Sequence, residues 1–389
     1  MDPYRSSDDM KDGTARRMNG KRSREAKIQK WQNKQTKLEK RREEISNRDE
    51  WIEKHSDFVS VINLEDVRDA KNIASGNALR ERLSPYFNLQ DNSLVSRAKD
   101  GRRRFIAEGT ETVRLLMQQL TVSNNSSSGL FPVEVESIFV KPSVFFDPPV
   151  SLIFDFQKMI DLTKHTTVCV SEAAKRAKVH VMIGAENVLS EAAGFTISRG
   201  ALACGFVPEN RNFAWLMEYF RKTRMSGEGE LRLLALDGIC DTANLGSVVR
   251  CASAFGVHAV LLSKDCCDPW YRRAVRVSMG HIFRIPCVRV DNLVQALTAL
   301  SQEPFAVTSY AAVIDPRADL LLENIAQGAI PKSWCCIVGS EGKGISCDVI
   351  QAATTTLRIG MYDHVDSLSV PVATGILLHG LSERSKPLL

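Results

Sequence analysis

The feature that most constrains the fold is a series of strongly apolar segments in the C-terminal part of the chain. LRLLALDGI (residues 231–239) and WCCIVGS (334–340) are apolar at successive positions, so both of their faces are apolar. Segments of helical character, NLGSVVRCASAFG (244–256) and VDNLVQALTAL (290–300), lie between them. A strand with two apolar faces must be covered on both sides, which crossover helices do in parallel sheets. Residues 231–389 are therefore predicted to form an α/β domain with a mostly parallel sheet.

Composition divides the rest of the chain into three segments. Residues 1–75 are predicted to be a basic, partly helical or disordered extension, with 13 Lys or Arg against three Asp or Glu between Lys11 and Arg42. Residues 76–215 alternate short strands and helices, which predicts a smaller α/β domain. The sequence SGEGE predicts a linker over 216–230. The extension is either a solvated tail or an arm that binds RNA or directs localisation, because basic arms bind phosphates without sequence preference.

Charge, hydropathy and cysteine usage exclude several classes of protein. The formal net charge of +5 is mildly basic, which is compatible with a nucleic-acid partner. No run of 18 apolar residues and no apolar N-terminal signal segment occurs, so neither a membrane span nor secretion is expected. The ten cysteines form no C-x-x-C pair, so no metal site is expected. A reducing compartment is expected, either cytoplasm or nucleus, with an organelle still possible.

Two candidate motifs follow apolar segments. DTANLGSVVR (241–250) opens a helix, where Gly246 permits close approach of another chain or a ligand and Arg250 is placed to grip a phosphate. The alternative is a surface arginine beside a tolerated glycine. GSEGKG (339–344) is neither a Walker loop nor a dinucleotide-binding fingerprint. Its position after a buried strand favours a binding loop over a flexible turn.

Two further segments are less specific when taken alone. LRIGM (357–361) and DSLSVPVA (366–373) form a strand and a small-residue turn before an apolar helix, which core packing alone would explain. PWYRRAVR (269–276) combines three arginines with two aromatic residues, which suits phosphate contact and base stacking. The alternative for this segment is a solvated basic helix.

Taken together and in this order, the first three motifs resemble the signature of the SpoU (TrmH-like) family of RNA 2′-O-ribose methyltransferases, in the knotted SPOUT superfamily. The resemblance covers about residues 231–384, and segments 102–117 and 194–206 resemble the family's ribosomal-protein-like substrate-binding domain. The residues that match the three motifs are Asn244, Gly246 and Arg250; Gly339, Glu341, Gly342 and Gly344; and Ile359, Met361, Ser367, Leu368 and Val370.

The resemblance implies a C-terminal domain threaded as a trefoil knot, the cofactor S-adenosylmethionine (SAM), a homodimer, and methyl transfer to a ribose 2′-hydroxyl of tRNA or rRNA. The implied catalytic residues are Arg250, Asn244, Glu341 and Ser369. The implied cofactor-binding residues are Gly339, Gly344, Ile359, Met361 and Leu368. The expected RNA-binding residues are Arg102, Arg103, Arg104, Arg199, Arg272, Arg273 and Arg276.

Arginine stays protonated, so Arg250 is expected to hold phosphate and stabilise alkoxide charge, with Asn244 and Glu341 orienting it. The chain departs from the family pattern at Ser369, where Asn is usual, at Pro371, where a small residue is usual, and at Gly360, where Pro is usual. Two alternatives follow, a catalytically impaired SpoU-like RNA-binding protein and a nucleotide-binding α/β enzyme of another kind.

Overall fold

The computed structural model describes the C-terminal part of the chain nearly continuously and shorter stretches before it. By its internal contacts the chain forms two compact units, Met1–Val59 and Ser60–Leu389. Arg199 and all of residues 147–178, within the predicted smaller α/β domain, lie outside the described residues. The described residues are 29–37, 39, 43, 46, 50–54, 56, 59–63, 83–86, 89, 101–122, 133–146, 179–184, 190, 200–208, 211–223, 229–326, 329–362, 365 and 367–382.

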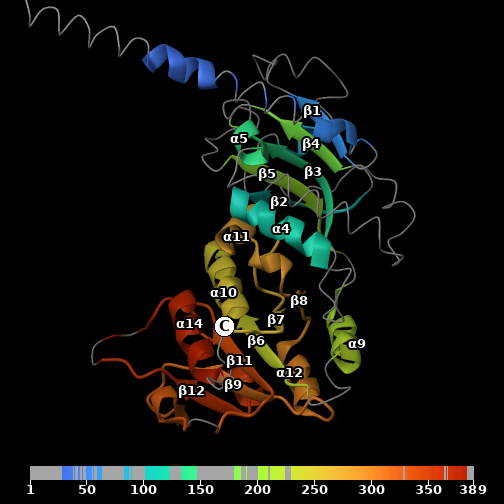
Figure 1. Cartoon of the computed structure of the whole chain (residues 1–389). Coiled ribbons are helices and arrows are strands. Elements are labelled where there is room, and N and C mark those ends of the chain that lie inside the picture. Colours follow the sequence, from blue (N-terminus) through green and yellow to red (C-terminus); the bar gives the residue numbers. More distant parts are fainter. Residues whose placement is uncertain are drawn as a thin grey trace, which may run out of the picture. The chain divides into compact units, whose positions relative to one another are not determined.

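The larger sheet has seven strands in the order β10-β12-β9-β11-β6-β7-β8 (Figure 1). Its neighbouring strands all pair in parallel, as the apolar segments predicted. β11 lies between β6 and β9, so the strand order reverses there, and ligands of open α/β sheets bind beyond the carboxyl ends at such a point. The strands are β6 (Arg232–Asp237), β7 (Ala259–Leu262), β8 (Cys287–Arg289), β9 (Thr308–Ala312), β10 (Leu320–Leu321), β11 (Trp334–Gly339) and β12 (Thr355–Arg358).

Helices cover both faces of this sheet, which buries strands that are apolar on both sides (Figure 1). One face packs against α9 (Phe213–Thr223), α12 (Leu293–Ser301) and α13 (Cys347–Ala352). On the other face, α14 (Val370–Leu381) packs on β11 and on α10 (Thr242–Ala254), and α10 in turn contacts α11 (Arg272–Val277). Three short 3-10 helices also occur among the described residues: η1 (Ser84–Tyr86), η2 (His281–Phe283) and η3 (Leu322–Asn324).

The smaller sheet is mixed, with the order β1-β4-β3-β5-β2. β3 pairs in parallel with β4, whereas β5 is antiparallel to both β2 and β3. The buried side chains of β2, α4 and β3 form its core, among them Phe105, Leu116 and Phe139. Its elements are β1 (Val59–Asn63), β2 (Arg104–Glu108), α4 (Thr110–Val122), β3 (Glu134–Val140), α5 (Pro142–Phe146), β4 (Val179–Ile183) and β5 (Ala201–Phe206).

The segment between the two sheets differs from the expected linker over 216–230. Its first part belongs to α9, whose Leu216 and Phe220 are fully buried against the larger sheet. The physical reason is the spacing of apolar residues in FAWLMEYF, which gives the helix an apolar face. The core of the larger domain therefore begins about one helix earlier than the Gly-rich signal at 226–230 indicates.

Candidate functional site

A cavity of about 520 Å³ lies at the carboxyl ends of β9 and β11, where the strand order reverses. Its volume is within the range of about 300–1,000 Å³ that is usual for small-molecule sites. Three segments far apart in the sequence form most of its walls: residues 312–318 after β9, the glycine loop after β11, and the start of α14. The lining residues are Ala312, Val313, Ile314, Asp315, Arg317, Ala318, Val338, Gly339, Ser340, Glu341, Gly342, Lys343, Gly344, Ile345, Ile350, Thr356, Ser367, Leu368, Val370 and Ala373.

The glycine loop after β11 folds back on itself as a tight turn. The Gly344 amide donates to the Ser340 carbonyl at 2.9 Å, and Gly344 has a φ of +67°. A Cβ on Gly339 would lie 2.1 Å from the carbonyl carbon of Gly344, so only glycine fits there. A Cβ on Gly342, by contrast, would meet nothing within 4 Å. The two glycines therefore have different roles: Gly339 permits the turn, whereas position 342 tolerates a side chain.

The first and second motifs meet at this loop. The Asn244 side chain donates from Nδ2 to Oε1 of Glu341 at 3.0 Å, across 97 positions of sequence. Asp241 caps α10 by accepting the Asn244 amide at 2.8 Å, which fixes the start of the helix. At the far end of the loop, Asp237 accepts both the amide and the hydroxyl of Ser346 at 2.8 Å. The loops that follow β6 and β11 are thus joined by hydrogen bonds.

The third motif lies at the start of α14 and the end of β12. Leu368 lines the cavity, whereas Ser369 is exposed at the N-cap position and its side chain makes no capping hydrogen bond. Ile359 and Met361 are half-buried and are not among the lining residues. Gly360, which stands where the family pattern usually has Pro, donates its amide to Glu323 at 2.9 Å.

Arg250 lies on α10, and its side chain is exposed. Among the described residues, Arg250 is in none of the ion pairs, and it does not line the cavity. Its charge acts on His281, whose pKa is lowered first by burial and then by Arg284 and Arg250. The His281 ring contacts the Ser253 hydroxyl at 2.7 Å. The exposed Arg250 side chain can therefore meet an external anion, but outside the 520 Å³ cavity.

Gly246 packs against the same chain, and this differs from the expectation that another chain or a ligand approaches it. It is buried, and a Cβ there would lie 2.5 Å from the carbonyl oxygen of Ala274 in α11. Gly246 therefore permits the close contact between α10 and α11. Arg250, which is exposed on the same helix, is the residue of this motif that an external partner can reach.

The seven arginines expected to bind RNA have different surroundings. Arg199 lies outside the described residues, and Arg273 is exposed on α11. Arg102 pairs with Glu134 at 2.7 Å and lies 3.5 Å from the centre of the Phe206 ring. The other four also pair with carboxylates of this chain, namely Arg103 with Asp268, Arg104 with Glu136, and both Arg272 and Arg276 with Glu108.

Three of these arginines, Arg103, Arg272 and Arg276, form ion pairs that join the part of the second unit with the smaller sheet to the part with the larger sheet. Glu108 ends β2 and is nearly buried, with 7% of its side chain exposed. It accepts from Arg272 at 2.8 Å and from Arg276 at 3.3 Å, both on α11. Glu108 was not a sequence candidate, because a single carboxylate at a strand end belongs to no motif. A binding role for Arg272 and Arg276 stays a prediction, and it would have to coexist with this pairing.

Neither a membrane-spanning helix nor a metal cluster occurs among the described residues. None of the described helices is long and apolar enough to span a bilayer. No cluster of three or more His, Cys, Asp or Glu side chains there could hold a metal ion.

An open parallel sheet with a cavity at its reversal point defines a ligand-binding α/β domain. Residues 232–379 match the model of the SpoU rRNA Methylase family, so this part of the chain is similar to that family. An uncharacterised tRNA/rRNA methyltransferase of Mycobacterium tuberculosis is 32% identical over 194 residues, which are 50% of this chain and 62% of that protein. The 23S rRNA (guanosine-2′-O-)-methyltransferase RlmB of Escherichia coli is 33% identical over 38% of this chain and 57% of its own. The chain thus spans about three fifths of the length of these relatives.

Solved structures share the fold. The SpoU methyltransferase AviRb of Streptomyces viridochromogenes superposes with a TM-score of 0.53 at 17% identity, covering 77% of this chain and 96% of its own. An AdoMet-bound rRNA methyltransferase of Sinorhizobium meliloti gives 0.52 at 19% identity, covering 83% and 97%. These likenesses confirm the predicted fold class, a mixed α/β chain with a large parallel sheet.

Proposed function

We propose that this chain transfers a methyl group from SAM to a ribose 2′-hydroxyl of an RNA, either tRNA or rRNA. The observation that carries the proposal is the hydrogen bond between Asn244 and Glu341. It joins two sequence motifs at the rim of a cavity of cofactor size. The names of the curated relatives support the substrate class, because they include tRNA/rRNA and 23S rRNA 2′-O methyltransferases.

The lining of the 520 Å³ cavity fits SAM. Val338, Ile345 and Leu368 offer apolar contacts for the adenine ring, and the glycine loop offers backbone groups without side chains in the way. Gly339 and Gly344, together with Leu368, are the residues proposed to hold the cofactor. When bound, SAM supplies a methyl group on a positively charged sulfonium, and transfer then requires an oxygen placed in line with it.

The proposed catalytic role of Arg250 is electrostatic. Its guanidinium is exposed, stays protonated, and can hold a phosphate by two parallel hydrogen bonds. A phosphate held there would place the neighbouring ribose, and the positive charge would stabilise the negative charge that develops on the 2′-oxygen. Asn244 and Glu341 are proposed to fix the loop near which the RNA lies. Ser369, exposed beside Leu368, is proposed to contact the RNA or the cofactor.

A homodimer, with a trefoil knot in each subunit, is part of the proposal. Arg250 does not line the cavity of its own subunit, so a second copy that brings its Arg250 to this cavity would complete the site. The surface beside the cavity suits such a contact, because Val372 and Ile376 on α14 are 51% and 38% exposed and lie on one helix face. Exposed apolar groups on a helix adjoining a site are typical of subunit interfaces.

Two glycine variants test SAM binding. Gly339→Ala forces a Cβ into the backbone of Gly344, so calorimetric titration with SAM should show binding weakened by at least tenfold. Gly342→Ala, in the same loop, should bind SAM like the wild type because its Cβ enters open space. Equal affinities for the two variants would mean that the glycine loop does not form the cofactor site.

The transfer step is tested separately with RNA. Arg250→Lys keeps the charge but loses the paired donors, so it should bind SAM normally and transfer far less tritiated methyl to bulk tRNA or rRNA. Wild-type SAM binding with no transfer to either RNA would favour the alternative, a SpoU-like RNA-binding protein that has lost catalysis. Methyl groups found on a base and not on ribose would reject the 2′-hydroxyl as the acceptor.

A further inference from the structure

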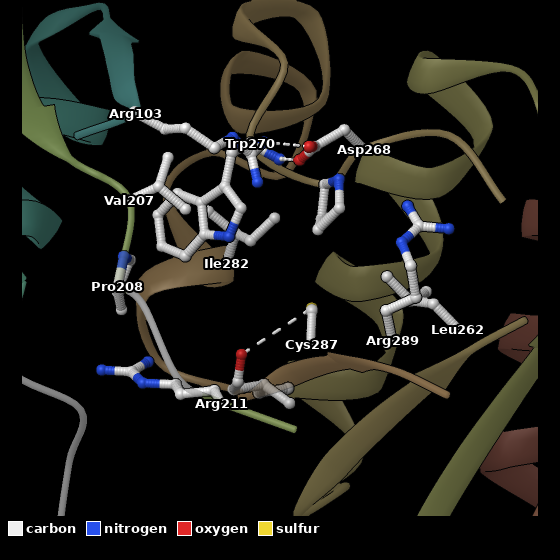
Figure 2. A pocket seen from close by; sticks show the side chains of 12 residues that line it. Arg103, Val207, Pro208, Arg211, Leu262, Asp268, Trp270, Ile282, Cys287 and Arg289 are labelled. Atoms are coloured by element: carbon white, nitrogen blue, oxygen red, sulfur yellow. Dashed lines mark hydrogen bonds and ion pairs between the residues drawn. The ribbon is translucent and has the colours of Figure 1, made fainter. Parts of the chain in front are cut away.

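A second cavity, separate from the one of 520 Å³, is too small for a ligand of cofactor size. Its volume is about 140 Å³, below the range of about 300–1,000 Å³ for small-molecule sites. Figure 2 shows its lining, in which the Asp268 carboxylate pairs with Arg103. Arg289 donates there to four backbone carbonyls. The larger cavity, which shares no lining residue with this one, is therefore where a further ligand contact can be assigned.

The cavity of about 520 Å³ has an apolar interior and a charged opening. Val338, Ile345 and Val370 expose only 4–8% of their surface, so they belong to the inner part of the lining. The charged lining residues are Asp315, Arg317, Glu341 and Lys343, of which the last three are exposed. The opening thus carries two basic and two acidic side chains, and balanced charges suit a zwitterion better than a phosphate. SAM carries such a group, because its amino-acid end has both a carboxylate and an ammonium.

Arg317 is held in a fixed orientation by Asp315, two positions earlier in the chain. The Arg317 amide donates to Asp315 Oδ1 at 2.9 Å, and its Nε donates to the same oxygen at 3.1 Å. Nη2 donates to Oδ2 at 3.0 Å, so one edge of the guanidinium is bonded to the carboxylate. The opposite edge, formed by Nη1 and the second hydrogen of Nη2, has no partner among the described residues, and 89% of the side chain is exposed. A guanidinium has five N–H donors, so this second edge can bind another carboxylate.

Lys343 is the other cation at the opening, and it is less suited to recognising a carboxylate. Within the described ranges its ammonium takes part in no ion pair, so no carboxylate there fixes its position. Lysine acts as a point charge on a flexible stem, whereas arginine presents a planar fork that matches the two oxygens of a carboxylate. The hydrogen bonds to Asp315 thus make Arg317 the better oriented of the two cations.

We propose that Arg317 binds the carboxylate at the amino-acid end of SAM through the second edge of its guanidinium, while Asp315 holds the first edge. This arrangement leaves the apolar interior of the cavity for the adenine ring. Arg317 is then a specificity-determining residue, because it distinguishes SAM from adenosine compounds that lack an amino-acid end. The inference rests on the proposed function and deepens it.

Two ligands test this contact by calorimetric titration of the full chain without RNA. S-adenosylhomocysteine and 5′-methylthioadenosine share the adenosine and an uncharged thioether sulfur, and the amino-acid end is present only in the first. Arg317→Gln should weaken binding of S-adenosylhomocysteine by about three- to fivefold, the upper end for an exposed ion pair. It should leave binding of 5′-methylthioadenosine unchanged. Equal weakening for both ligands would mean that the variant alters the cavity itself, and this result would reject the carboxylate contact.

Two variants at the opening separate the arginine fork from its charge. Lys343→Gln removes a positive charge from the same lining, and it should weaken S-adenosylhomocysteine binding by less than about twofold. Arg317→Lys keeps the charge without the fork, so it should bind nearly as weakly as Arg317→Gln. Equal losses in Lys343→Gln and Arg317→Gln, or wild-type affinity in Arg317→Lys, would assign the effect to the general charge of the opening and overturn the proposal.

Arg221→Gln is the control for removing an arginine elsewhere on the surface. Arg221 on α9 is 55% exposed, pairs with Glu218 and does not line the cavity, so this variant should bind both ligands like the wild type. A loss of S-adenosylhomocysteine affinity equal to that of Arg317→Gln would show that the effect is not specific to the opening, which would also overturn the proposal.

The same titrations separate this inference from the proposed function. If the wild type and Arg317→Gln bind S-adenosylhomocysteine equally well, the carboxylate contact fails and the proposed cofactor stands. If the wild type binds neither ligand, the proposed cofactor fails, and the contact with Arg317 falls with it.

Discussion

Gly360 illustrates what a single residue contributes to the cofactor region. Its amide donates to Glu323, and a Cβ there would lie 2.9 Å from the same carboxylate oxygen. Proline, the usual residue of the family pattern here, has no amide hydrogen to donate. The departure at Gly360 is therefore matched by a hydrogen bond that ties the end of β12 to η3, and it is no sign of a degraded site.

His281 predicts a pH dependence of stability. Burial, Arg284 and Arg250 lower its folded pKa below the usual 6.5. At a pH between the unfolded pKa of 6.5 and the lower folded pKa, His281 is protonated in the unfolded chain but neutral in the folded one. The free energy of unfolding therefore decreases as the pH falls through this window. His281→Gln lacks this loss, so the wild type should lose stability relative to the variant as the pH is lowered from about 7.5 to about 5.5.

Urea unfolding of both proteins at each pH measures this difference. The other six histidines are common to both chains and cancel in the comparison. If the free energies of unfolding of the wild type and His281→Gln fell in parallel as the pH was lowered, His281 would have the same pKa in the folded and unfolded chains.

At the scale of elements, contact between α10 and α11 depends on Gly246. Gly246→Ala places a Cβ 2.5 Å from a backbone oxygen of α11, which cannot move without the helix. We expect a loss of about 2 kcal/mol in the free energy of unfolding, typical of overpacking. Gly375→Ala in α14 is the control, because its Cβ would meet only Cys251 Sγ at 3.8 Å.

The control should be neutral or slightly stabilising, since alanine favours a helix over glycine by about 1 kcal/mol. Chemical denaturation of the two variants beside the wild type measures both effects. A Gly246→Ala protein as stable as the wild type would mean that α11 shifts readily and does not fix the start of the site.

Arg272 and Arg276 of α11 form ion pairs with Glu108 at the end of β2, and these pairs connect the two elements. Glu108→Gln leaves Arg272 and Arg276 facing a neutral amide at a site where the carboxylate is nearly buried. We expect a loss of about 1–3 kcal/mol, less than for a fully buried pair because Arg276 is 46% exposed.

Glu111→Gln is the matched control for this change. Glu111 is 58% exposed in its pair with Arg114, and such surface pairs contribute less than about 1 kcal/mol. Thermal unfolding of both variants gives the comparison. If Glu108→Gln cost no more than Glu111→Gln, the pairing would not hold the two sheets together.

Sequence predicted the strands and helices of the larger sheet well, because their apolar patterns are local. It predicted that Asn244 and Glu341 belong to one site, which their hydrogen bond supports. It did not predict the ion pairs of Arg102, Arg103 and Arg104, since an arginine cluster has the same pattern whether it faces phosphate or carboxylate. Pairing across 165 positions depends on the packing of two sheets, and no local pattern encodes that.

At the scale of the whole molecule, the large cavity and the most basic segment lie in different parts of the chain. The 520 Å³ cavity proposed to hold SAM is built entirely from residues 312–373, whereas an excess of positive charge, 13 basic against three acidic residues, lies between Lys11 and Arg42. The first compact unit ends at Val59, within β1. A truncation that removes the charge without damaging the smaller sheet must therefore end before Val59.

Deleting residues 1–56 should weaken RNA binding and flatten its salt dependence, because each lost phosphate contact lowers the slope by about 0.7–0.9. SAM binding should be unchanged, since no deleted residue lines the cofactor cavity. Filter binding to bulk tRNA across a range of KCl concentrations, with SAM calorimetry beside it, measures both quantities. An unchanged salt slope with weaker binding would assign the extension a role other than phosphate contact. Loss of SAM binding would instead mean that the extension supports the fold of the second unit.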